Sequence, residues 1–218
     1  MAVTIASGMT KRTTHASHDF DLSGGILCLN FANTVSRRRI PEQSYDNLVE
    51  YGSLIQFAQQ SKVVSAGYAR DLMTVGTAEP RKAGAVLRAA TIFREAVYRV
   101  FSAVAEGRQV PARDLRLIED FAGEAMQHRQ LVSGRGTYRW EWRRDKSDAL
   151  AHVLWPIAAS AVDLLTSERL KKVRMCEAKT CAWLFLDESR NHSRRWCDMK
   201  VCGNREKARR HYQRELIG

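Results

Sequence analysis

The sequence predicts a mainly α-helical protein, in which a helical N-terminal domain with one small β-hairpin precedes a small cysteine-rich C-terminal module. Three observations support this fold class. Apolar residues recur at helical spacing up to about residue 167. Aromatic residues alternate with polar ones beside the glycines at 134 and 136, which is typical of a hairpin. Four of the five cysteines lie between Cys176 and Cys202.

Composition and length set the expected domain organisation. The chain has 218 residues, of which 44% are hydrophobic and 27% charged, so it can bury a substantial core. We expect residues 1–18 to form a disordered tail, 19–167 the helical domain and 168–218 the C-terminal module. There is no apolar run long enough for a membrane span, and the polar start does not resemble a signal peptide, which favours a cytoplasmic protein.

Apolar spacing and end signals place the helices. The clearest predicted helix covers residues 79–106, where apolar side chains form one continuous stripe and Gly107 ends the helix. Shorter helices are predicted over 26–35, 45–60 and 65–73, the last with Ser65 as its N-cap. Pro111 opens another helix, and Ser147 or Asp148 caps a final one that reaches residue 166, where Pro156 would introduce a kink.

The predicted hairpin joins residues 131–133 to residues 137–142 through the segment Gly134-Arg135-Gly136. Tyr138, Trp140 and Trp142 alternate along the second strand and so share one face. We interpret that face as a cover for the hydrophobic core, in preference to a stacking platform for a ligand.

The four clustered cysteines form two pairs, Cys176-x4-Cys181 and Cys197-x4-Cys202, separated by fifteen residues. Two pairs joined by a loop of this length indicate a zinc ribbon or treble clef, although two intervening residues are more usual within a pair. Four thiolates leave no open coordination position, so the zinc would be structural. Disulfides and unrelated buried thiols are the alternatives. Short strands over 172–175 and 183–186 and a helix from 203 favour the treble clef.

Positive charge is concentrated in the same module. Residues 168–218 contain 14 Lys/Arg and 7 Asp/Glu, and they supply +7 of the net charge of +11. The charge alone fits a solvated surface as well as a contact with a polyanion. With the zinc module beside it, DNA is the first expected partner, with RNA or an acidic protein as alternatives. Asn204 and Arg205 adjoin the last cysteine and have a second interpretation as supports of the metal site. The candidate nucleic-acid contacts are Arg190, Arg194, Arg195, Asn204, Arg205, Lys207, Arg209, Arg210 and Arg214.

Two segments resemble known families. The tetrapeptide 202–205, Cys-Gly-Asn-Arg, resembles the signature of the CGNR zinc fingers, and residues 27–34 resemble the opening of the ABATE domain that precedes this finger in bacterial proteins. The first resemblance is specific over residues 176–210, and the second is looser because Asn30 stands where the family usually has an acidic residue. Together they imply a stress-response transcription regulator with a DNA-binding finger.

No catalytic motif is evident, and a closed metal site does not suit hydrolysis, so we do not expect an enzyme. We expect the helical domain to sense a small molecule or to mediate dimerisation. Asn33, Thr34 and Arg37 are candidates for lining a ligand pocket, with hydrogen bonding at a buried helix end as the alternative for Asn33 and Thr34. Because one finger buries little surface, specific DNA binding would require a homodimer.

Overall fold

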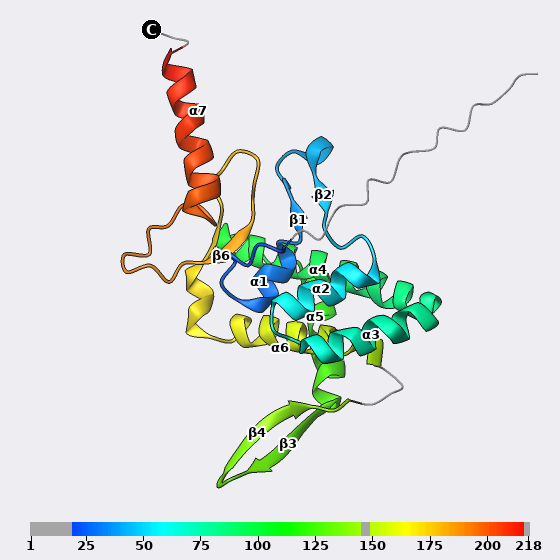
Figure 1. The fold of residues 1–218 in the computed structure, drawn as a ribbon. Coiled ribbons are helices and arrows are strands. Elements are labelled where there is room, and N and C mark those ends of the chain that lie inside the picture. The colour runs from blue at the N-terminus through cyan, green and yellow to red at the C-terminus, as the bar shows by residue number, and fades with distance from the viewer. Residues whose placement is uncertain (1–18, 145–148, 216–218) are drawn as a thin grey trace, which may run out of the picture.

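The computed structural model describes residues 19–144 and 149–215, so the predicted tail at 1–18 and the predicted cap at Ser147 or Asp148 lie outside the described residues. Figure 1 shows a helical body from which a C-terminal helix and a β-hairpin project at opposite ends. None of the described helices combines the length and the apolar character that crossing a bilayer requires. The helices are α1 (Leu27–Ala32), α2 (Tyr51–Gln60), α3 (Ala66–Ala78), α4 (Pro80–Ala105), α5 (Ala112–Gln127), α6 (Leu154–Leu165) and α7 (Asn204–Glu215). The strands are β1 (Val35–Ser36), β2 (Tyr45–Asp46), β3 (Arg129–Gly134), β4 (Thr137–Trp142), β5 (Val173–Met175) and β6 (Leu184–Leu186).

Helix α4 lies at the centre of the core and confirms the strongest helix prediction. Its apolar stripe is buried, and Phe93 stacks on Phe121 of α5 with ring centroids 4.4 Å apart. The ring centroid of Phe93 also lies 5.9 Å from that of Phe31 in α1. Beyond the end of α4, Gly107 takes a left-handed conformation with φ of 63°, which a residue without Cβ adopts at no steric cost. One helix therefore holds α1 and α5 around a common core.

Four helix boundaries differ from the predicted ones, and one of them is the end of α3, which continues to Ala78 instead of stopping at residue 73. Helix α1 ends at Ala32, after which the chain forms β1; β1 pairs with β2 inside the segment predicted as the start of the second helix. Helix α2 begins only at Tyr51, behind a capping box between Glu50 and Ser53. Pro156 lies in the first turn of α6 and not in its interior. A proline there removes no helical hydrogen bond, so no kink is required.

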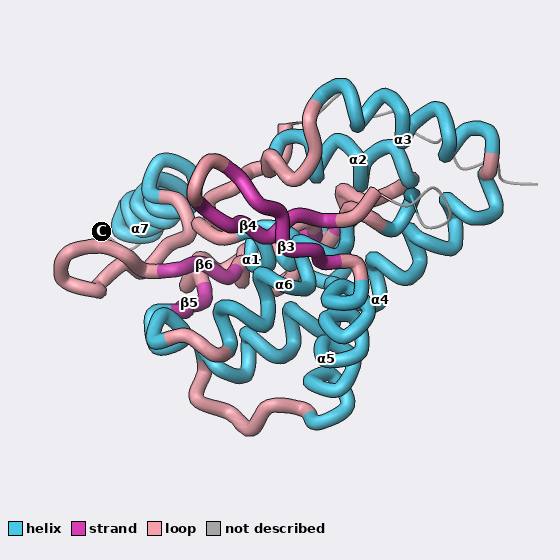
Figure 2. The backbone as a smooth tube through the Cα atoms, turned by 90° about the horizontal axis from the view of Figure 1, so that it is seen from below, coloured by secondary structure: helices cyan, strands magenta, loops and turns pink. Residues whose placement is uncertain are grey.

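The hairpin β3–β4 lies where it was predicted, although β3 extends from Arg129 to Gly134 and leaves only residues 135 and 136 in the turn, but its predicted role as a core cover is wrong. The strands pair from Arg129 opposite Trp142 to Gly134 opposite Thr137. Tyr138 and Trp140 are 74% and 54% exposed, and only Trp142 packs against the core, near Trp155. The reason is that the hairpin extends away from the helical body after its first residues (Figure 1), so that in Figure 2, viewed from below, it is drawn in front of α1 and α6.

A paired carboxylate between α4 and α5 gives a pH-dependent contribution to stability. The Arg99 guanidinium donates two hydrogen bonds of 2.7 Å to buried Asp114 and holds the pKa of that carboxyl below its usual range, against the opposing effect of burial. Because the pKa of Asp114 is lower in the folded state, its ionised form stabilises the fold at pH values above the unfolded-state pKa of about 3.9. This contribution is lost as the pH falls through the folded-state value.

We therefore expect Asp114→Asn to lower the free energy of unfolding by about 1 kcal/mol at pH 7, because Arg99 is half-exposed and solvent weakens the pair. The difference from the wild type should shrink towards pH 3. Urea unfolding at both pH values measures it. Asp120→Asn, at an exposed carboxylate on the same helix, is the control. An equal loss in both variants, or a loss that does not change with pH, would contradict the assignment.

Candidate metal centre and nucleic-acid interface

Short strands, turns and a helical turn bring the four cysteines close together. Strand β5 leads directly into Cys176, and the turn that contains Cys181 returns the chain to β6, which pairs antiparallel with β5. Cys197 ends the following long loop, and Cys202 lies in the helical turn Met199–Gly203 that precedes α7. The predicted two strands and helix of the treble clef are therefore present, with Cys176 at the end of β5 and Cys202 just before α7.

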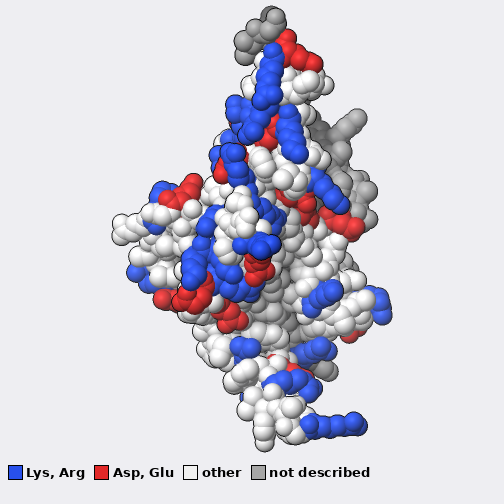
Figure 3. Space-filling model, turned by 90° about the vertical axis from the view of Figure 1, so that its left-hand side faces the viewer, with Lys and Arg blue, Asp and Glu red and all other residues white. Residues whose placement is uncertain are grey.

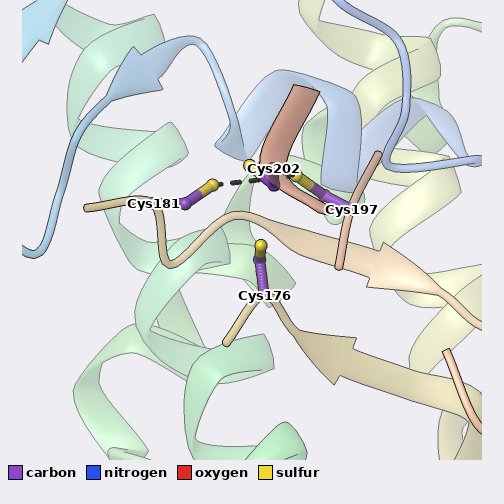
Figure 4. A group of neighbouring side chains, drawn as sticks. All are labelled: Cys176, Cys181, Cys197 and Cys202. Atoms are coloured by element: carbon purple, nitrogen blue, oxygen red, sulfur yellow. Dashed lines mark hydrogen bonds between the residues drawn. The ribbon is translucent and has the colours of Figure 1, made fainter. Parts of the chain in front are cut away.

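The geometry of the sulfurs fits one zinc ion. The four Sγ atoms all lie within 4.8 Å of one another, and all four cysteines are buried. Figure 4 shows their side chains turned towards a common centre. The Sγ of Cys197 is 3.7 Å from that of Cys181 and 3.6 Å from that of Cys202. A tetrahedron with Zn–S bonds of about 2.3 Å has edges of about 3.8 Å, whereas a disulfide would bring two sulfurs to about 2.05 Å. The cluster is a zinc site.

Hydrogen bonds to the sulfurs support the metal ligands. The Arg205 guanidinium donates to Cys202 Sγ at 3.1 Å, and the Trp183 backbone N–H donates to Cys181 Sγ at 3.5 Å. Donors of this kind neutralise part of the negative charge on a four-thiolate zinc site and fix its ligands. The position of Arg205 therefore agrees with its second interpretation, as a residue that supports the metal site. Cys28 is different, because burial in the helical core raises the pKa of its thiol to about 12.

A buried carboxylate organises the long loop between the cysteine pairs. Asp187 accepts hydrogen bonds from the Ser189 hydroxyl at 2.5 Å and from the Arg194 backbone N–H at 3.0 Å. Burial alone would raise the pKa of Asp187, but these donors hold it below its usual range. The Arg194 side chain lies over the Phe185 ring and donates to the carbonyls of Trp196 and Cys197. Arg194 therefore holds the loop that carries Cys197.

The zinc module shares its core with the helical body. Asn33, which caps the C-terminus of α1, donates from Nδ2 to the Leu184 carbonyl at 2.8 Å and accepts from the Leu184 N–H at 2.9 Å. The Trp183 indole N–H donates to the Val35 carbonyl at 2.8 Å. Leu184 and Leu186 of β6 are buried in the same apolar cluster as α1 and α4. The finger is therefore docked on the helical body by both hydrogen bonds and apolar contacts.

The structure sorts the candidate nucleic-acid residues into two groups. Arg194, Arg195, Arg205 and Arg209 all have partners within the protein, and the partners of Arg195 and Arg209 are Glu177 and Glu206. The other candidates are exposed and have no side-chain hydrogen bond or ion pair among the described residues. These exposed candidates are Arg190, Asn204, Lys207, Arg210 and Arg214.

Helix α7 presents most of this second group away from the protein. The helix leaves the body at the zinc centre and extends beyond it (Figure 1), and Figure 3 shows Lys and Arg side chains along its length and over the adjacent finger. Lys207, Arg210 and Arg214 are spaced three and four residues apart, so they share one face. We call these three residues the α7 stripe. Arg205 and Arg209, in contrast, face the zinc centre and Glu206.

The three residues considered for a ligand pocket occupy different environments. Asn33 and Thr34 are buried and hydrogen-bonded at the end of α1, where the Thr34 hydroxyl donates to the Phe31 carbonyl at 2.8 Å. Arg37 is exposed and lines a cavity of about 170 Å³ between the β1–β2 turn and the finger. Asn33 and Thr34 are not among the described lining residues. Sequence reasoning missed the rest of this lining, because it comes from four separate segments, at residues 21, 36–45, 180–183 and 197–205, and it includes three of the metal-site cysteines.

Two protein-family models match the chain. The ABATE model, described as "Putative stress-induced transcription regulator", matches residues 25–168. The CGNR zinc-finger model matches residues 172–215, which include all four metal-site cysteines and the whole of α7. No curated protein sequence matches the chain. The two matches together cover both the helical body and the zinc module.

Proposed function

Because the chain belongs to the ABATE family of regulators and ends in a CGNR zinc finger, we propose that it is a DNA-binding transcription regulator whose α7 helix contacts the duplex. The observation that carries this proposal is the α7 stripe, a row of exposed cations without internal partners on a helix that projects from the body. Cations placed in this way bind phosphates and release counterions, the main sequence-independent source of DNA affinity.

The zinc centre supports this role by fixing the start of α7. Cys202 binds the metal two residues before the helix begins at Asn204, and Arg205 and Glu206 of its first turn hydrogen-bond to Cys202 and to the Lys179 N–H. The direction of α7 is therefore set by the metal and by the finger core. A helix of 12 residues is about 18 Å long, and the major groove, about 12 Å wide, accepts such a helix.

Asn204 is the residue best placed to read a base. It is exposed at the N-terminus of α7, and its amide can make a pair of hydrogen bonds to adenine in the major groove. Arg205 is less available, because its guanidinium already donates to Cys202 Sγ. The residues of α7 would therefore have different roles in DNA binding. Asn204 contributes to sequence preference, Arg205 maintains the metal site, and the α7 stripe supplies affinity.

We expect the triple variant Lys207→Ala/Arg210→Ala/Arg214→Ala to lose at least tenfold in affinity for a random-sequence duplex at low salt. The dependence of log K on log salt should become shallower by about 2.7, because each phosphate contact contributes about 0.9. Fluorescence anisotropy across a salt series measures both values, and zinc content confirms that the finger is intact. Arg70→Ala/Arg81→Ala/Arg88→Ala removes the same charge from exposed positions of α3 and α4 and is the matched control.

Two outcomes would count against DNA binding through α7. The first is an unchanged salt slope in the α7 triple variant, and the second is an equal loss in the control variant, which would indicate a response to net charge alone. A structured RNA duplex measured in parallel distinguishes the polymers. Tighter binding of RNA with the same dependence on the α7 stripe would assign the finger to RNA.

A further inference from the structure

We propose that hairpin β3–β4 is a second nucleic-acid-binding element, which takes single-stranded nucleic acid by stacking unpaired bases on Tyr138 and Trp140. The inference is separate from the proposed role of α7, because the hairpin projects from the opposite end of the molecule (Figure 1). It rests on three properties of the hairpin, which are the face that carries its aromatic rings, its charge and the spacing of the rings.

The strand register places the large apolar side chains on one exposed face. Leu131 lies opposite Trp140, and Ser133 lies opposite Tyr138. Directly opposed residues project to the same side of a hairpin, so these side chains form a continuous surface. Leu131, Tyr138 and Trp140 are all more than half exposed. The opposite face carries Val132 and Arg139, so the aromatic rings are confined to one side.

Nothing in the described part of the protein covers this face. Strands β3 and β4 pair only with each other within the described residues. The hairpin is anchored at its base, where Trp142 packs near Trp155 and the Arg143 N–H donates to the His128 carbonyl at 2.8 Å. An isolated two-stranded hairpin is marginally stable in water, and contiguous exposed apolar surface marks an interaction site. The outer half of the hairpin therefore presents its rings on a fixed base.

The charge of the hairpin identifies the chemistry of the partner. The hairpin, residues 129–142, contains three arginines and one acidic residue, Glu141, which forms an ion pair with Arg139. The Arg129 guanidinium lies 5.2 Å from the ring centroids of both Trp140 and Trp142, so cations and aromatic rings are interleaved. A second copy of the same hairpin would oppose like charges. A polyanion with aromatic groups of its own, which is a nucleic acid, matches both the charge and the rings.

The spacing of the rings favours unpaired bases. Tyr138 and Trp140 are two residues apart on one strand, and a rise of about 3.4 Å per residue separates them by about 6.8 Å. Bases stacked within a duplex are spaced by about 3.4 Å along each strand. The backbone positions that carry these two rings are therefore about twice as far apart as stacked bases, which leaves room for one base against each ring when the nucleic-acid strand is extended.

The test uses the full-length zinc-bound protein and fluorescently labelled oligo(dT) and oligo(rU) of 20 nucleotides. We expect Tyr138→Ala/Trp140→Ala to weaken binding about tenfold or more, since base–aromatic stacking contributes substantially at each ring. Tyr138→Phe/Trp140→Phe keeps aromatic faces and should retain most of the affinity. Leu131→Ala removes an exposed aliphatic side chain from the same face and should have little effect. Binding of the oligonucleotide should also quench tryptophan fluorescence in the wild type.

Several results would overturn the proposal. These are the absence of oligonucleotide binding by the wild type, equal affinity in the double alanine variant, and a loss in Leu131→Ala as large as in that variant. The last result would indicate apolar docking of a protein. The triple variant in the α7 stripe separates this proposal from the previous one. It should lose duplex affinity and keep oligonucleotide affinity, and the reverse pattern would remove the hairpin from nucleic-acid binding. The ratio of dT to rU affinity then assigns DNA or RNA.

Discussion

Replacing one zinc ligand, in Cys202→Ser, should remove the metal and destabilise the helical body as well as the finger. The finger has little apolar core of its own, with Ala178, Phe185 and the cysteines as its buried members. Zinc binding supplies about 10–16 kcal/mol of apparent free energy in comparable small modules. The finger should therefore unfold without its metal.

The effect should reach the body because β6 is part of its core. Without an ordered finger, Leu184 and Leu186 no longer cover α1 and α4, and the hydrogen bonds of Asn33 lose their partner. Loss of a buried leucine typically costs about 2–5 kcal/mol, which is a large share of the stability of an ordinary domain. We expect one cooperative melting transition in the wild type. In the variant, the Tm should be at least 10 °C lower, because each kcal/mol of lost stability lowers the Tm by about 2–4 °C.

Metal analysis together with circular dichroism melting tests this prediction. Cys28→Ala is the matched control, because Cys28 is buried in the helical core and lies outside the metal site. It should keep one zinc per chain and melt close to the wild type. If Cys202→Ser lost its zinc while the helical transition stayed at the wild-type temperature, the finger and the body would be independent units, contrary to their shared core.

The second large effect is expected for Asn33→Ala, which removes both hydrogen bonds between α1 and Leu184. Asn33 is only 2% exposed, so water does not readily replace the lost partners, and the backbone N–H and carbonyl of Leu184 remain buried and unsatisfied. Each such group costs about 1–3 kcal/mol. We therefore expect the free energy of unfolding to fall by about 2–5 kcal/mol, with zinc retained in the folded state.

Denaturant unfolding of zinc-loaded protein measures the loss. Asn47→Ala is the control, because Asn47 also donates to a backbone carbonyl, that of Thr34, but from a half-exposed position. Its loss should be about 1 kcal/mol or less. Equal losses in the two variants would show that the contact between α1 and β6 has no special weight in holding the finger on the body.

These two predictions bear on the proposed function through α7. The helix is fixed to the zinc centre by Cys202 and Arg205, the zinc centre to β6, and β6 to α1 by Asn33. The contact of Asn33 with β6 is buried, and that of Arg205 with Cys202 is partly buried. A change at Asn33 should therefore alter how the α7 stripe is presented to DNA, even though Asn33 lies outside the finger. Under the proposed function, the helical body would therefore help to hold α7 in its DNA-binding position.

Features that depend only on neighbouring residues could be predicted from the amino-acid sequence. The apolar stripe of α4, the N-cap at Ser65, the hairpin turn near Gly136 and the zinc set of four cysteines are local patterns. Helical period, capping chemistry and metal-ligand spacing all act over a few residues or within one small module. For that reason the fold class and the metal could be predicted without any knowledge of tertiary packing.

Tertiary structure decided what depends on contacts between distant segments. The alternation of aromatic and polar residues predicts which side chains of β4 share a face. Whether Tyr138 and Trp140 are buried depends on whether the helical body reaches that face, and they are exposed, so the predicted core cover was wrong. Of the basic residues in the finger, Arg194 holds its loop while Arg210 is exposed, although both are arginines in one basic segment. The bonds between Asn33 and Leu184 span 151 positions. A residue's hydrogen-bond partner and burial are properties of the folded chain, and local sequence contains neither.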